Sequence, residues 1–154
     1  MKKKNERLSK SKLEKLQKLR RMALESISRS HRQSTHLSIL IVDDNETFGR
    51  YLMIMLRAKF PGLNFNLHFS PKAALSSVVD EQPDLAIVDI NMPELNGFQL
   101  AKGINSILDK QIPILFVSAN SLSKDELSDL SFDCEVDFMA KPITEDVLSF
   151  KIDN

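Results

Sequence analysis

The chain has 154 residues, 42% of them hydrophobic, and its 21 Lys and Arg side chains balance 21 Asp and Glu. This length and composition are typical of one globular domain with a short appendage. No apolar run approaches the roughly 20 residues that cross a bilayer, and the basic start lacks the apolar stretch of a secretory signal. The single cysteine, Cys134, excludes an internal disulfide, so we expect a cytoplasmic protein with no membrane span.

The beginning of the chain differs in charge from the rest. Residues 1–36 contain 12 Lys and Arg against 3 Asp and Glu, whereas residues 37–154 contain 9 against 18. We therefore predict two parts, a basic N-terminal extension over 1–36 and a folded domain over 37–154. Heptad-like spacing predicts an extra amphipathic helix from about Leu8 to Ile27, with a thin apolar seam of Leu13, Leu16, Ala23 and Ile27.

This basic extension has several interpretations. It could be a solvated tail, a helix that dimerises or binds a partner protein, an arm that contacts nucleic acid or a membrane surface, or a segment that docks on the acidic remainder of the chain. Residues 1–36 contain no Phe, Tyr or Trp to stack on bases, and they predict no second helix that would form a reading head. We therefore do not expect nucleic-acid binding.

From residue 37 onward, short apolar runs alternate with segments of helical periodicity, which predicts βα units wound into a parallel sheet. The five predicted strands are Leu37–Val42, Asn64–Phe69, Leu85–Val88, Ile114–Ser118 and Val136–Ala140. The first, third and fourth are apolar apart from Ser38 and Ser118, as expected of strands covered on both faces. In the second, Phe65, Leu67 and Phe69 alternate with polar residues, so we place this strand at a sheet edge.

Helices with one apolar stripe are predicted between these strands. The first carries its stripe on Phe48, Leu52, Met55 and Leu56 and ends before Pro61; the second opens at Ser70-Pro71; the third follows Gly97 and turns Leu100, Ala101, Ile104, Ile107 and Leu108 inward. A weaker helix is predicted over Lys124–Leu130, and a short final helix from Thr144 onward.

Polar residues stand at the carboxyl ends of four strands, where a buried strand would simply turn. They are Asp43 and Asp44 after the first, Asp89 after the third, Ser118 at the end of the fourth and Lys141 after the fifth. Ligands of open α/β sheets bind at this edge, where the winding direction reverses. With strand order 2-1-3-4-5 the three acids meet at the reversal, where they would repel one another unless a cation such as Mg²⁺ joined them.

Such a group of side chains suits phosphoryl chemistry. A carboxylate can attack phosphorus to form an acyl phosphate while a metal ion and a lysine neutralise the phosphoryl oxygens. We assign Asp89 as the nucleophile and Ser118 as a hydrogen-bond donor to a phosphoryl oxygen. Lys141 would pair with Asp89 before transfer and with the phosphoryl group afterwards. Each residue alone could be a turn, cap or strand-end residue, but their joint occurrence favours a common site.

The motifs that carry these residues resemble the receiver domain of two-component response regulators. They are ILIVDDN at 39–45, LAIVDINMPELNG at 85–97, ILFVSAN at 114–120 and DFMAKP at 137–142. The resemblance implies a flavodoxin-like, doubly wound, five-stranded α/β fold. By resemblance, Asp43, Asp44 and Asp89 bind Mg²⁺ together with the backbone carbonyl of Asn91, and Asp89 accepts phosphate from a histidine kinase or phosphotransfer protein.

The same resemblance assigns further roles. Phe138 is the aromatic whose rotation accompanies movement of Ser118, and Asn91 and Asn120 flank the water that attacks the acyl phosphate, so they would influence its lifetime. One departure from the family is Cys134, which stands seven residues before the lysine, where the family usually has glycine.

We therefore expect a phosphorylation-dependent signalling switch, not an enzyme, that changes its affinity for a downstream partner or for an effector domain missing from this chain. One alternative is an aspartate-nucleophile, Mg²⁺-dependent phosphohydrolase of the haloacid dehalogenase type. Those enzymes have a second acid two residues after the nucleophile, where this chain has Asn91. The other alternative is a receiver-like scaffold that is never phosphorylated, against which the intact acids and lysine argue.

Overall fold

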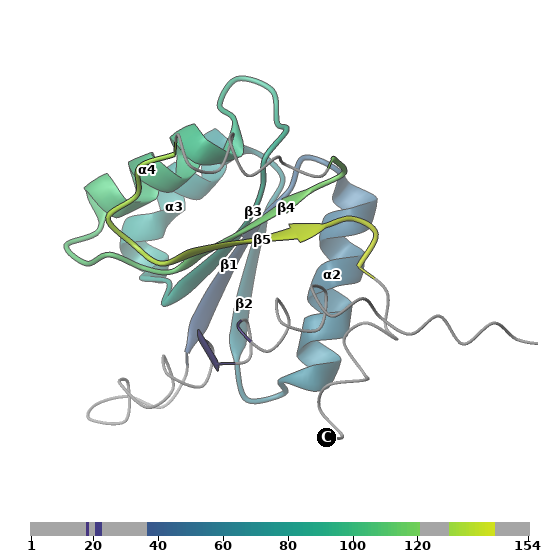
Figure 1. Ribbon diagram of the computed structural model, residues 1–154. Coiled ribbons are helices and arrows are strands. Elements are labelled where there is room, and N and C mark those ends of the chain that lie inside the picture. The colour runs from purple at the N-terminus through teal and green to yellow at the C-terminus, as the bar shows by residue number, and fades with distance from the viewer. Residues whose placement is uncertain (1–17, 19–20, 23–36, 121–129, 144–154) are drawn as a thin grey trace, which may run out of the picture.

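A computed structural model describes residues 18, 21, 22, 37–120 and 130–143. The strands are β1 (Ser38–Val42), β2 (Asn64–His68), β3 (Leu85–Asp89), β4 (Ile114–Ser118) and β5 (Val136–Ala140), and the helices are α2 (Glu46–Lys59), α3 (Pro71–Glu81) and α4 (Gly97–Ile107). All strand pairs are parallel, in the order β2-β1-β3-β4-β5. Figure 1 shows α3 and α4 on one side of this sheet and α2 on the other. The predicted doubly wound α/β fold and its strand order are confirmed.

Every predicted strand is present, with ends that differ by at most one residue. β1, β3 and β4 are buried at every position because helices cover both of their faces. β2 lies at one edge of the sheet, as its alternating pattern predicts, and β5 lies at the other. The carboxyl ends of β1 and β3 are therefore neighbours at the point where the chain reverses its winding.

One residue of a predicted helix faces differently from its prediction, and two predicted helices lie outside the described residues. Ile107 was expected to face the core, but it is exposed, because it is the last residue of α4 and the buried stripe runs through Ile104 to Leu108. The predicted helix at 124–130 and the final helix from residue 144 lie outside the described residues, except for Leu130, which is not helical. No helix in the described part of the chain is long and apolar enough to span a membrane.

Apolar side chains fill both faces of the sheet. The α3 and α4 side centres on Phe116, Val88 and Ile104. The α2 side contains Ile41 and Leu115 of the sheet, together with four residues from outside the sheet: Met22, Leu52, Met55 and Ile143. Of the predicted N-terminal helix, only Lys18, Arg21 and Met22 are described, and all three are helical.

The loops after β1 and β3 are held by helix caps. The side chain of Asn45 accepts a hydrogen bond from the Phe48 N–H and starts α2. A capping box between Asn96 and Gln99 starts α4. Gly97 lies so close to β3 that a Cβ there would be 2.4 Å from the backbone oxygen of Asp89. These contacts fix the backbone that presents Asp89 at the sheet edge.

Candidate functional site

Three acidic side chains meet at the carboxyl edge of the sheet. Asp43 and Asp89 follow or end the neighbouring strands β1 and β3 and are 2% and 5% exposed, whereas Asp44 is exposed. One carboxylate oxygen from each residue lies within 4.8 Å of the others. Converging carboxylates of this kind are the hard oxygen donors that Mg²⁺ binds in proteins. The donor set therefore fits the predicted ion.

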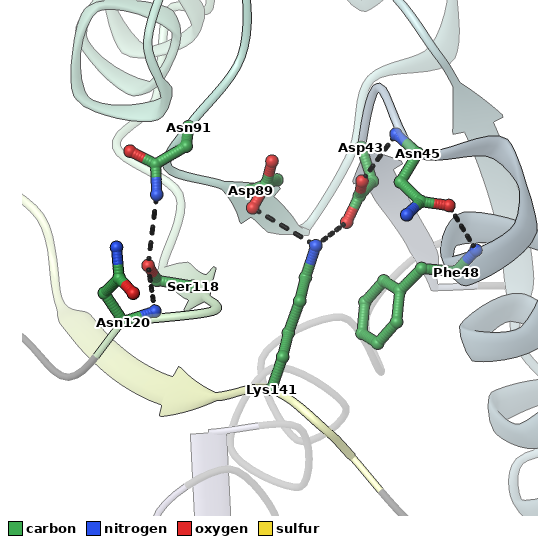
Figure 2. Close-up of polar contacts among 8 residues, drawn as sticks. All are labelled: Asp43, Asn45, Phe48, Asp89, Asn91, Ser118, Asn120 and Lys141. Carbon is green, nitrogen blue, oxygen red and sulfur yellow. Dashed lines mark hydrogen bonds and ion pairs between the residues drawn. The ribbon is translucent and has the colours of Figure 1, made fainter.

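Lys141 joins two of these acids. Its Nζ lies 2.8 Å from Asp43 Oδ2 and 3.3 Å from Asp89 Oδ1, as Figure 2 shows. The lysine follows the edge strand β5, so its extended side chain reaches across the end of β4 to the acids. Its ammonium offsets part of the repulsion between two buried carboxylates.

The electrostatic balance at Asp89 is nevertheless unfavourable to its charged form. Burial raises the pKa of Asp89 from 3.8 to about 6; Asp43 and Asp44 also raise it, and Lys141 lowers it without compensating. The carboxylate is therefore mostly ionised at neutral pH, but at a cost in free energy. A divalent cation beside it would reduce that cost.

Ser118 ends β4 and is buried beside the acids. Its Oγ accepts hydrogen bonds from the Asn91 side-chain amide at 3.4 Å and from the Asn120 N–H at 3.2 Å. The two asparagines predicted to flank an attacking water thus both contact the same hydroxyl (Figure 2). Both asparagines are solvent-exposed, so they line the entrance to the site.

Phe138 lies away from the acids, on the side of the sheet that α3 and α4 cover. Its ring stacks on Phe116 with a centroid distance of 5.2 Å. Phe116 belongs to the strand that ends at Ser118, and Phe138 belongs to the strand that leads to Lys141. This aromatic pair connects the two strands that carry the hydroxyl and the ammonium, and the ring is only partly buried.

Two residues of the site were not among those predicted from the sequence to belong to it. The Asn45 N–H donates to Asp43 Oδ1 at 2.9 Å, so both oxygens of Asp43 have partners. The ring centroid of Phe48, in the first turn of α2, lies 4.1 Å from Lys141 Nζ. The capping pattern before α2 could have indicated Asn45. Phe48 was predicted only as part of the buried stripe, and its spacing gave no signal of a contact with the distant lysine.

Comparisons with known proteins identify a family with this fold. The family profile described as the response regulator receiver domain matches residues 39–153. A transcriptional regulatory protein, RprY of Bacteroides fragilis, is 31% identical over 117 residues, which are 76% of this chain and 48% of RprY. The response regulator ArlR of Staphylococcus haemolyticus is 24% identical over 75% of this chain and 50% of ArlR. The chain thus spans about half the length of these relatives.

Solved structures show the same fold. The chemotaxis protein CheY4 of Vibrio cholerae is similar with a TM-score of 0.64 and 20% identity, over 77% of this chain and 97% of CheY4. A two-component response regulator from Clostridium difficile has a TM-score of 0.62 and 22% identity, over 75% of this chain and 92% of that protein.

Proposed function

This chain belongs to the response regulator receiver domain family of two-component systems, and on that premise we propose that it is a phosphorylation-dependent switch with Asp89 as the phosphoacceptor. The observation that carries the proposal is the position of Lys141, whose ammonium lies between Asp43 and Asp89 at the winding reversal of the sheet. A phosphoryl-transfer site needs a nucleophile, a cationic side chain and ligands for a metal ion, and Asp89, Lys141 and the two further acids could supply them.

The proposed transfer is a displacement at phosphorus. A carboxylate oxygen of Asp89 attacks the phosphorus of a phosphohistidine on a kinase or phosphotransfer protein. The P–N bond breaks, its electron pair stays on the imidazole nitrogen, and an acyl phosphate remains on Asp89. Lys141 then pairs with the phosphoryl oxygens, and Ser118 donates its hydroxyl proton to one of them. Because the pKa of Asp89 is about 6, most of the nucleophile is already ionised at pH 7.

Asp43, Asp44 and Asp89 would hold Mg²⁺ together with the backbone carbonyl of Asn91. When bound, the ion supplies positive charge that the phosphoryl oxygens need during transfer. Asp43 meanwhile orients Lys141 through its 2.8 Å contact. Asn91 and Asn120 at the entrance would tune how readily water reaches the acyl phosphate, because both already bind the hydroxyl that must move toward it.

Phosphorylation would then act on two strands at once. Lys141 would leave its position between the acids, and Ser118 would exchange its asparagine partners for the phosphoryl group. Phe138 would adjust because its ring stacks on Phe116 of the strand carrying Ser118. We propose that this rearrangement changes the affinity of the β4 and β5 surface for a downstream protein or an effector domain.

Uptake of a small phosphodonor such as acetyl phosphate, with Mg²⁺, tests the proposal. Intact-mass measurement should show one phosphoryl group per chain in the wild type and none in Asp89→Asn, while the exposed α3 variant Asp80→Asn should match the wild type. Repeated turnover with release of inorganic phosphate would favour the hydrolase instead. Absence of labelling in the wild type would favour the unphosphorylated scaffold, and labelling of Asp89→Asn would refute the assignment of the acceptor.

A further inference from the structure

The edge strand β5 is touched by residues from the start of the chain. Met22 is 2% exposed and belongs to the apolar cluster on the α2 side of the sheet, with Leu115, Val117 and Ile143. Lys18, four residues earlier on the same helical face, donates from Nζ to the backbone oxygen of Val136 at 3.4 Å. These helical residues (purple in Figure 1) therefore contact the domain in two ways, through the apolar side chain of Met22 and through the hydrogen bond of Lys18.

The polar half of the contact lies on the open edge of the sheet. Alternate carbonyls of a parallel strand face the same neighbour, and the oxygen of Glu135 accepts from the Ile114 N–H of β4. The oxygen of Val136 therefore points away from β4, toward the side where no further strand pairs in the described sheet. Exposed strand edges are sites of unwanted pairing, and a lysine across one blocks it.

β5 also carries a buried acid on the side of the sheet where the Met22 cluster lies. Asp137 is buried on that face, opposite Phe138, because side chains alternate along a strand. Its Oδ1 accepts from the Phe138 N–H, but its buried Oδ2 has no hydrogen-bond partner among the described residues. Residues 1–36 carry 12 Lys and Arg against 3 acids, while the remainder carries 9 against 18. The extension is thus opposite in net charge to the rest of the chain.

We propose that Lys18 and Met22 form an intramolecular latch on the edge strand β5, and that this latch favours the unphosphorylated arrangement of the domain. The second part rests on the function proposed above. β5 presents Phe138 on one face, Asp137 on the other and Lys141 just beyond its end, so the latch contacts the strand that the acyl phosphate would pull through Lys141. A contact that binds one arrangement better than another opposes the change by linkage.

Docking is tested in the full-length chain without a phosphodonor. Met22→Asp should accelerate amide hydrogen exchange in β5 about tenfold or more, the factor expected from losing a buried methionine anchor. Ile54→Asp, at an apolar side chain that is 64% exposed on α2, should leave β5 exchange unchanged. If Met22→Asp does not fold, Met22→Ala replaces it in the same measurement. Unchanged β5 exchange, or an equal acceleration in all five strands, would overturn the latch.

A second copy of the chain is the rival source of the contact. Protection of β5 that is the same at low and high protein concentration supports a latch within one chain. Protection that disappears on dilution, together with a dimer in sedimentation, overturns the intramolecular assignment and favours a dimer through the N-terminal helix.

The regulatory part is tested with acetyl phosphate and Mg²⁺. Releasing the latch should raise the steady-state phosphorylated fraction, with a several-fold larger ratio of phosphorylated to unphosphorylated chain in Met22→Asp and no change in Ile54→Asp. An unchanged ratio despite altered β5 exchange would overturn the coupling. If the wild type takes up no phosphoryl group, the proposed function and this coupling fail together, whereas the exchange result still decides whether the segment docks.

Discussion

Replacing Asp89 by asparagine should stabilise the metal-free protein at neutral pH. Folding raises the pKa of Asp89 from 3.8 to about 6, because burial and Asp43 disfavour its charge more than Lys141 favours it. The folded state therefore binds this proton more tightly than the unfolded state does. The resulting stability is fully present below pH 3.8 and is lost as the pH rises through about 6.

The size of the effect follows from the shift. A pKa change of one unit corresponds to about 1.4 kcal/mol, so the ionised carboxylate lowers the free energy of unfolding by about 3 kcal/mol above pH 7. Asparagine keeps the shape of the side chain and removes the charge. Lys141 keeps its 2.8 Å partner Asp43 in the variant, so no buried ammonium is left unpaired.

Urea unfolding in the presence of a chelator, from pH 4 to 8, measures this contribution. The difference in unfolding free energy between Asp89→Asn and the wild type should be below about 1 kcal/mol at pH 4 and should grow toward about 3 kcal/mol in favour of the variant above pH 7. Taking the difference removes the contributions of the other titrating groups. For the exposed Asp80→Asn variant, the same difference in unfolding free energy should not change with pH. Saturating Mg²⁺ should stabilise the wild type more than Asp89→Asn. A variant that is less stable than the wild type at pH 7.5 without metal would show that the ion pair with Lys141 outweighs burial, and the reasoning would be wrong.

Two further substitutions test how the site is held. Gly97→Ala should lower the free energy of unfolding by about 1–3 kcal/mol in urea titrations, because its Cβ would meet the backbone oxygen of Asp89 at 2.4 Å. Gly62→Ala, where nothing lies within 4 Å of the new Cβ, should change it by less than about 0.5 kcal/mol, and equal effects would contradict the close approach. Phe48→Leu should slow phosphoryl uptake from acetyl phosphate several-fold, because it removes the aromatic face beside the Lys141 ammonium, worth about 0.5–2 kcal/mol. Phe48→Tyr should restore the rate, and a leucine variant as fast as the tyrosine variant would exclude a role for the ring.

Much of the site could be predicted because it depends on backbone topology. The period of apolar residues locates the strands, and the parallel order 2-1-3-4-5 brings the carboxyl ends of β1 and β3 together whatever the side chains do. Asp43 and Asp89 therefore had to be neighbours once the strands were placed correctly. The position of Lys141 is less strongly determined by the topology. The edge strand fixes only where its side chain begins, and the contact with the acids depends on the length of the lysine.

Contacts between side chains of distant elements are a different problem, and the N-terminal segment shows why. Heptad spacing predicts a seam of Leu13, Leu16, Ala23 and Ile27, which lies outside the described residues. Met22, which the structure buries, is one position from Ala23 and about 100° around the helix from it, so the spacing did not single it out. Spacing within a helix tells which side chains share a face. It does not tell which face is chosen when the apolar seam is thin and the other surface is unknown. The contacts that the structure shows are the outward carbonyl of Val136, which Lys18 binds, and the apolar cluster that contains Met22, and neither can be inferred from the helix alone. A flexible methionine can fit an irregular apolar patch, and a lysine one turn earlier is long enough to reach the carbonyl at the strand edge.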